Sequence, residues 1–173
     1  MKKKYFLFLI FQLSIISFAQ TKVDEFLTVK FPCKVIKKDT VFSKNQILAY
    51  YCSDMSFSLQ RIVTESIQDN LKSLNEYYLG TENGFTKSIA EKGFIKQSTK
   101  IFKIDKYIGL QVSYVDSKTS SKVIECRFIV LNKYLYTFIY FNKTNFNEKN
   151  KNEFLNSIKI DLSKKPQQLS SKK

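Results

Sequence analysis

Three cysteines and a few acidic residues are the side chains in this sequence that could carry chemistry. The cysteines are Cys33, Cys52 and Cys126, and the candidate carboxylates are Asp54, Glu65, Asp105, Asp116 and Glu125. Two carboxylates that face one another can act as general acid and general base. None of these carboxylates belongs to a catalytic motif. We therefore expect solvated side chains or ion pairs, such as Glu125 with a lysine on a neighbouring strand.

The chain contains no histidine. This excludes Ser–His and Cys–His nucleophile pairs and removes the commonest zinc ligand. The four glycines form no phosphate-binding loop. We expect no catalytic, cofactor-binding or metal site and no cofactor. A carboxylate-based periplasmic hydrolase is the enzymatic alternative.

Cys33 and Cys52 are the candidate disulfide. They flank a predicted strand–turn–strand unit, which could place them opposite one another in an oxidising compartment. Such a bond closes a loop of about 18 residues and would contribute roughly 3 kcal/mol. Two buried free thiols are the alternative. Cys126 shares a strand face with Ile124, Phe128 and Val130, which predicts a small core residue rather than a reactive thiol.

The first 19 residues have the pattern of a secretory signal peptide. Lys2, Lys3 and Lys4 precede an apolar stretch from residue 5 to 18, and Ser17 and Ala19 supply the small residues of a cleavage site. Gln12 and two serines interrupt this stretch, which is shorter than a spanning helix requires. We expect cleavage after Ala19, a secreted or periplasmic protein, and no transmembrane segment in the mature chain.

The net charge of +14 results from 29 basic and 15 acidic residues. Without the three leader lysines, 26 basic side chains remain and the net charge is +11. Only two basic residues are arginine, Arg61 and Arg127, whereas reading of bases and phosphates favours arginine. Nucleic acid is therefore not an expected partner. An anionic lipid or glycan surface is an alternative partner.

The positions of the apolar residues predict strands, then a helix, then several more strands and a closing helix. Strands are expected at 26–31, 46–52, 56–64, 94–104, 107–116, 122–131 and 134–141, with turns at 37–45 and 117–121. Arg61 is the exception on the otherwise apolar face of Phe57, Leu59 and Val63. The stretch "RFIVLNKYLYTFIYF" (127–141) predicts a hairpin around Asn132 and Lys133, at the centre of the sheet.

Helices are expected after the third strand and at the end of the domain. Ile67, Leu71, Leu74 and Tyr78 recur at helical spacing after a Ser66 cap, and Gly80 is expected just past the helix end. A second helical piece through Phe85 and Ile89 would stop at Gly93. The closing helix, 147–160, buries Phe154, Leu155 and Ile158, with Thr144 or Asn145 as its cap. These elements predict a single α+β domain over 20–162, followed by a disordered basic tail at 163–173.

Four stretches in this order resemble the PsbP-like family of small extracytoplasmic proteins. They are "FLTVKFP" (26–32), "YIGLQVSY" (107–114), "RFIVLNKYLYTFIYF" (127–141) and "FLNSIKI" (154–160). The resemblance implies a central antiparallel sheet flanked by helices, an α/β/α sandwich. It also implies a non-catalytic role in binding or supporting other proteins.

We therefore expect a secreted, non-enzymatic binding or accessory domain whose partner is an unidentified envelope or extracellular protein. Tyrosines on an exposed sheet face could stack on a sugar or a partner strand, or they could pack in the core. Both interpretations stay open for Tyr50, Tyr134, Tyr136 and Tyr140.

Overall fold

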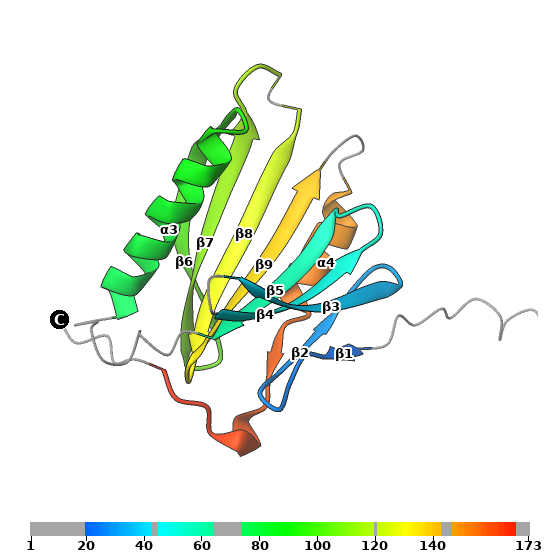
Figure 1. Ribbon diagram of the computed structural model, residues 1–173, viewed down its shortest axis with the longest axis vertical. Helices are drawn as coiled ribbons and strands as arrows, with labels where there is room; N and C mark the ends of the chain where they lie inside the picture. The colour runs from blue at the N-terminus through cyan, green and yellow to red at the C-terminus, as the bar shows by residue number, and fades with distance from the viewer. Residues whose placement is uncertain (1–19, 43–44, 64–73, 120, 143–146, 169–173) are drawn as a thin grey trace, which may run out of the picture.

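A computed structural model describes residues 20–42, 45–63, 74–119, 121–142 and 147–168 (Figure 1). Within these residues, two antiparallel sheets dominate the molecule. The larger has the order β3-β4-β5-β9-β8-β7-β6, and the smaller has the order β1-β2-β10. The strands of the large sheet are β3 (Val35–Phe42), β4 (Asn45–Cys52), β5 (Phe57–Val63), β6 (Phe94–Ile104), β7 (Tyr107–Asp116), β8 (Val123–Leu131) and β9 (Tyr134–Asn142). Those of the small sheet are β1 (Gln20–Lys22), β2 (Leu27–Lys30) and β10 (Lys159–Ile160).

The β8–β9 hairpin forms the middle of the large sheet, as the sequence predicted. Its register pairs Leu131 with Tyr134 and leaves Asn132 and Lys133 as the turn. Asn132 has φ 51°, in the left-handed region that asparagine tolerates better than most residues. Both strands are apolar on both faces because each face of the sheet is covered.

Different elements cover the two faces. Helix α3 (Leu74–Ala90) packs on β6 to β9 through Leu74, Tyr78 and Ile89, which are buried with Phe128. On the opposite face, the small sheet and helix α4 (Glu148–Asn156) enclose a second core, to which α4 contributes Phe154 and Leu155. Figure 1 shows α3 and α4 on opposite sides of the large sheet.

The expected α+β class and α/β/α sandwich are therefore wrong, and the fold is β-rich. The prediction placed all strands in one sheet, but β2 pairs with β1 and β10 and takes no part in the large sheet. These three strands form most of the layer where the sandwich would have had helices, and α4 is only 9 residues long. Sequence periodicity gives the face that a strand buries, but it does not tell which strands it pairs with.

Two local predictions also need correction. Residues 37–45, expected as a turn, lie mostly in β3, where polar side chains are tolerated because β3 is an exposed edge strand. Gly80 does not end the helix, because α3 continues to Ala90 as one element of 17 residues. Burial of Tyr78, Glu82 and Ile89 along one side outweighs the low helix propensity of Gly80 and Gly84.

Several predictions fall on residues outside the described ranges. They are the signal peptide at 1–19, the Ser66, Ile67 and Leu71 part of the helix, Glu65, and the proposed caps Thr144 and Asn145. The side chain that caps α4 is that of Asn147, which accepts a hydrogen bond from the Asn150 amide at 2.9 Å.

The first part of the expected disordered tail is hydrogen-bonded to the domain. Residues Leu162–Lys164 form a 3₁₀ turn, η1, and Pro166 beyond it is buried. The segment from 165 to 168 then crosses one end of the large sheet, where it bonds to Tyr107, Ile108 and Asn132. Composition predicts disorder poorly here because these contacts use backbone and amide groups rather than apolar side chains.

Candidate functional site

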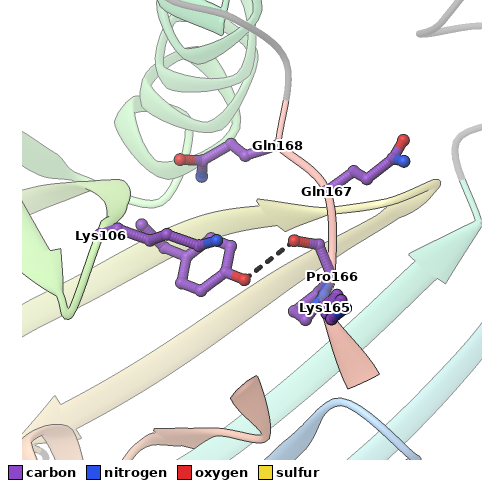
Figure 2. Close-up of a pocket in the computed structure, with 6 residues that line it drawn as sticks. Lys106, Lys165, Pro166, Gln167 and Gln168 are labelled. Carbon is purple, nitrogen blue, oxygen red and sulfur yellow. Dashed lines mark hydrogen bonds between the residues drawn. The ribbon is translucent and has the colours of Figure 1, made fainter. Parts of the chain in front are cut away.

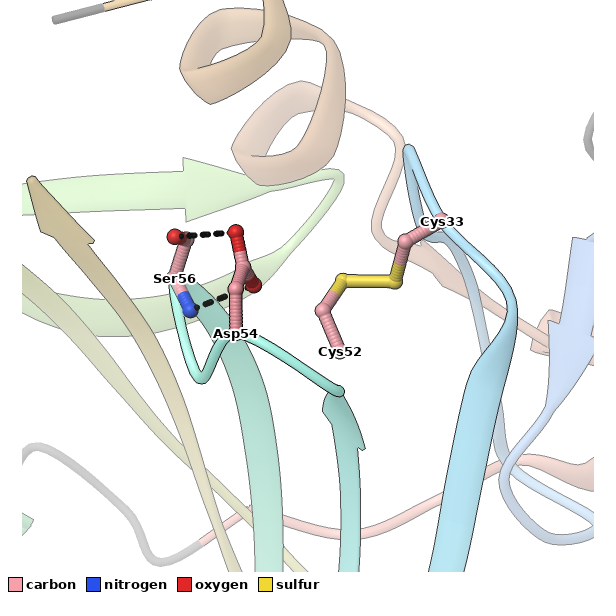
Figure 3. Close-up of a disulfide and its surroundings, with 4 residues drawn as sticks. All are labelled: Cys33, Cys52, Asp54 and Ser56. Carbon is pink, nitrogen blue, oxygen red and sulfur yellow. Dashed lines mark hydrogen bonds between the residues drawn. A yellow bond between two sulfur atoms is a disulfide. The ribbon is translucent and has the colours of Figure 1, made fainter. Parts of the chain in front are cut away.

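Cys33 and Cys52 form a disulfide, the pairing that the sequence favoured (Figure 3). Their Cα atoms lie 5.8 Å apart, because the β3–β4 register places Val35 opposite Cys52 and Cys33 just before it. The turn that follows is closed by Asp54, which accepts hydrogen bonds from the Ser56 amide at 3.0 Å and the Ser56 hydroxyl at 2.7 Å. The disulfide and the Asp54 hydrogen bonds therefore hold the start of β3 against the end of β4 and keep the β4–β5 turn in place.

Cys126 is fully buried in the core beneath α3. Burial raises the pKa of its thiol well above the usual value, and the neighbouring charge of Glu125 acts in the same direction. A thiol that is neither ionised nor exposed is unreactive. Cys126 is thus a core residue in the structure.

The candidate carboxylates that the structure describes hold local structure rather than face one another. Asp116 accepts hydrogen bonds from the Thr119 and Lys118 amides, which lower its pKa. Asp105 lies in the β6–β7 turn with φ 53°. The Gln111 side-chain amide donates a hydrogen bond to the Glu125 carboxylate at 2.8 Å, and Lys151 forms an ion pair with that carboxylate at 3.2 Å. That lysine comes from α4, not from a neighbouring strand as expected. This geometry gives the hydrolase alternative no support.

A partly buried network around Asp24 joins the two sheets. The Asp24 carboxylate accepts hydrogen bonds from the Phe26 and Leu27 amides at 2.9 and 3.1 Å. It also accepts one from Arg61 at 3.2 Å and one from the Tyr136 hydroxyl at 2.6 Å. Burial and the bond to Asp24 raise the pKa of Tyr136. Arg61, the exception on its strand face, was the sequence signal for this network, whereas nothing in the sequence pointed to Asp24.

The four tyrosines left open by the sequence belong to the core beneath the small sheet. Tyr50, Tyr136 and Tyr140 are buried, and Tyr134 packs at the margin of the same cluster. The guanidinium carbon of Arg61 lies 4.6 Å from the centroid of the Tyr134 ring. The tyrosines therefore form no exposed stacking platform.

Arg127 ties α4 to the sheet. Its guanidinium donates to the Leu155 carbonyl at 2.6 Å, at the end of the helix, and to Gln111 at 2.7 Å. It also lies 5.1 Å from the ring centroid of Phe102 on β6. A cation at a helix C-terminus is favourable. Both arginines of the chain thus have structural roles.

Strand β6 offers a long, accessible edge for binding. It is an edge strand of 11 residues, and among the described residues only β7 pairs with it. Ile95 and Ile101 are 56% and 54% exposed. The strand carries three positive charges, on Lys96, Lys100 and Lys103, and no negative charge. Lys96 pairs with the buried Glu82 of α3 at 2.7 Å, whereas Lys100 and Lys103 form no ion pair with a described residue.

Comparison with known proteins identifies no relative: no protein-family model matches the chain, and no curated protein matches it. In the part of the chain that the structure describes, the helices are too short or too polar to cross a membrane.

Proposed function

We propose that the protein is an exported, non-catalytic binding domain that uses the outer edge of β6 as its contact strand. The observation that carries this proposal is the length of that edge, 11 residues without a partner strand in the described chain. Such an edge presents a row of backbone N–H and C=O groups to which an extended segment can add as a further strand. The helix α3 and the sheet behind β6 hold this edge in place.

Charge defines the partner's chemistry. Lys100 and Lys103 are exposed, and neither forms an ion pair with a described residue. All charged residues of β6 are lysines, so pairing it with β6 of a second copy would bring like charges together, which is unfavourable. An extended segment rich in Asp and Glu, with aliphatic residues to cover Ile95 and Ile101, is complementary. The partner is therefore an acidic protein segment.

Export is the second part of the proposal. The pattern of residues 1–19 supports it, and a disulfide such as Cys33–Cys52 persists in an oxidising compartment. An envelope or extracellular protein is then the class of partner that β6 would meet.

Site-specific photo-crosslinking tests the contact strand. A photoreactive amino acid replaces Ile95 or Ile101 on β6, and Val41 on the opposite edge strand β3 serves as control because it is also exposed. We expect β6 positions to crosslink to an acidic segment of one envelope protein and Val41 not to. Lys100→Glu with Lys103→Glu should abolish that product, whereas Lys37→Glu with Lys38→Glu on β3 should preserve it.

Three results would contradict the proposal. They are crosslinking from Val41 but not from β6, a partner segment without acidic residues, and a product that survives charge reversal on β6. Binding to anionic vesicles that is lost in salt, without a protein product, would favour the lipid-surface alternative.

A further inference from the structure

The C-terminal segment forms a cleft at the end of the large sheet that carries the β6–β7 and β8–β9 turns (Figure 2). The cleft has a volume of about 420 Å³, within the range of small-molecule sites. Its lining consists of Lys106, Tyr107, Lys165, Pro166, Gln167 and Gln168. The first two residues come from the β6–β7 turn and the start of β7, and the others come from the segment after η1.

Hydrogen bonds fix the C-terminal side of this cleft. The Tyr107 hydroxyl donates to the Pro166 carbonyl at 2.9 Å, a bond that Figure 2 marks as a dashed line. The backbone of Gln167 exchanges two bonds with Asn132, both at 2.7 Å. The Gln168 side chain bonds to the amide and the carbonyl of Ile108 and to the carbonyl of Val130. The cleft therefore exists before any ligand binds, which lowers the entropic cost of binding.

The same bonds satisfy the backbone where β7 and β8 separate. Their pairing ends at Gly109 and Ile129. One position further, the Tyr78 hydroxyl bridges the Ile108 carbonyl and the Val130 amide, at 2.7 and 3.1 Å. The Gln168 side-chain amide donates hydrogen bonds to the Ile108 and Val130 carbonyls between the two strands. These backbone groups and the Gln168 side chain already have partners, so the charged groups left for a ligand in the cleft lining are those of Lys106 and Lys165.

Both lysines of the cleft lack an acidic partner. Neither Lys106 nor Lys165 forms an ion pair with the carboxylates of the described chain. The Lys106 ammonium lies 5.4 Å from the centroid of the Tyr107 ring. Asp161, the acidic residue nearest to Lys165 in the sequence, is occupied by the amide and hydroxyl of Ser163. Two cations at one cleft therefore attract an anion.

We infer that this cleft binds a small organic anion that carries a carboxylate or phosphate group. The two lysines supply donors for the anionic group, and Tyr107 and Pro166 supply the apolar part of the wall. This site is separate from the proposed protein contact on β6 and does not depend on it.

Titration of ¹⁵N-labelled protein with citrate, glucuronate and inorganic phosphate tests the inference, with neutral glucose as control. We expect saturable shifts at the amides of Tyr107, Gln167 and Gln168 with at least one anion and none with glucose. A response to citrate or glucuronate alone identifies a carboxylate site, and a response to phosphate alone identifies a phosphate site.

Charge-neutral variants separate the cleft from general surface charge. Lys106→Gln and Lys165→Gln should each weaken binding about tenfold, the effect of one charged hydrogen bond. Lys164→Gln, the matched control, removes an adjacent lysine that does not line the cleft. The inference is overturned if no anion shifts these amides, if glucose shifts them equally, or if Lys164→Gln weakens binding as much as Lys165→Gln.

Discussion

At the scale of single residues, most charged groups that looked available for chemistry hold the fold together. Asp24 and Arg61 join the two sheets, and Arg127 holds the end of α4. Removing one member of such a buried pair leaves an unpaired charge, which is why these groups are poor candidates for a site that must exchange ligands. Among the described residues, Lys100 and Lys103 of β6 and the two lysines of the C-terminal cleft instead form no ion pair.

Two glycines should respond to the same substitution in opposite directions. A Cβ at Gly109 would meet the Phe102 ring and lie 2.8 Å from the Phe128 carbonyl oxygen. Gly109→Ala should therefore lower the free energy of unfolding by about 1–3 kcal/mol through overpacking. A Cβ at Gly84 in α3 meets nothing within 4 Å, so Gly84→Ala should raise it by about 0.5–1 kcal/mol. Urea unfolding measures both, and a stable Gly109→Ala variant would contradict the close packing of β6 on β7.

Glu82 should make the domain sensitive to acid. Burial raises the pKa of this carboxyl group, but hydrogen bonds from Lys96 and Thr99 outweigh that effect and lower it overall. A carboxylate with a lowered pKa stabilises the fold above its unfolded pKa, and this contribution is lost as pH falls through the folded pKa. Glu82→Gln should thus be less stable than the wild type at neutral pH.

The stability difference between wild type and Glu82→Gln should shrink as pH falls toward ~3. Thermal unfolding across this pH range measures it. Glu91→Gln, at an exposed residue just after α3, is the matched control and should follow the wild type. A constant gap between wild type and Glu82→Gln at all pH values would show that Glu82 contributes by packing and not by charge.

At the scale of elements, the apolar pattern predicted β6 and β7 with the bounds that the structure has, and the β8–β9 hairpin with its Asn132 turn. These elements could be predicted because alternation and turn chemistry are local. The small sheet could not, because β2 pairs with β10 across more than a hundred residues of chain. The Cys33–Cys52 pair lies between these cases, since it depends on one hairpin only.

The disulfide should be a main support of the β3–β4 hairpin. Its two residues are 19 positions apart, and a loop of this size corresponds to about 3 kcal/mol. The double variant Cys33→Ala with Cys52→Ala should lose this stability and become insensitive to reductant, whereas the wild type with reductant should approach the variant. Denatured, unreduced wild type should expose a single thiol, that of Cys126. Three reactive thiols under those conditions would refute the bridge.

At the scale of the whole molecule, the C-terminal segment connects parts of the fold that no sequence pattern links. Residues 166–168 reach β7, β8 and the Asn132 turn, at sequence separations of 35 to 60. The sequence predicted disorder from residue 163, because a polar segment with one proline offers no apolar periodicity to recognise. The cleft that this segment forms was unpredictable for the same reason.

Neighbouring glutamines provide the test of this connection. The Gln168 side chain makes three hydrogen bonds to backbone groups of β7 and β8, whereas the hydrogen bonds described for Gln167 use its backbone alone. Gln168→Ala should lower the free energy of unfolding by about 1–3 kcal/mol, because it leaves partly buried groups without partners. Gln167→Ala should change it by less than about 0.5 kcal/mol, as for an ordinary surface substitution.

Hydrogen exchange locates the effect. In Gln168→Ala the Ile108 amide loses its acceptor and should exchange faster, whereas the Val130 amide keeps the Tyr78 hydroxyl and should remain protected. Equal stability of the two alanine variants, with unchanged exchange at Ile108, would mean that the C-terminal segment only lies against the sheet. Faster exchange at Ile108 alone would instead show that one side chain closes the gap between β7 and β8, and that the cleft depends on it.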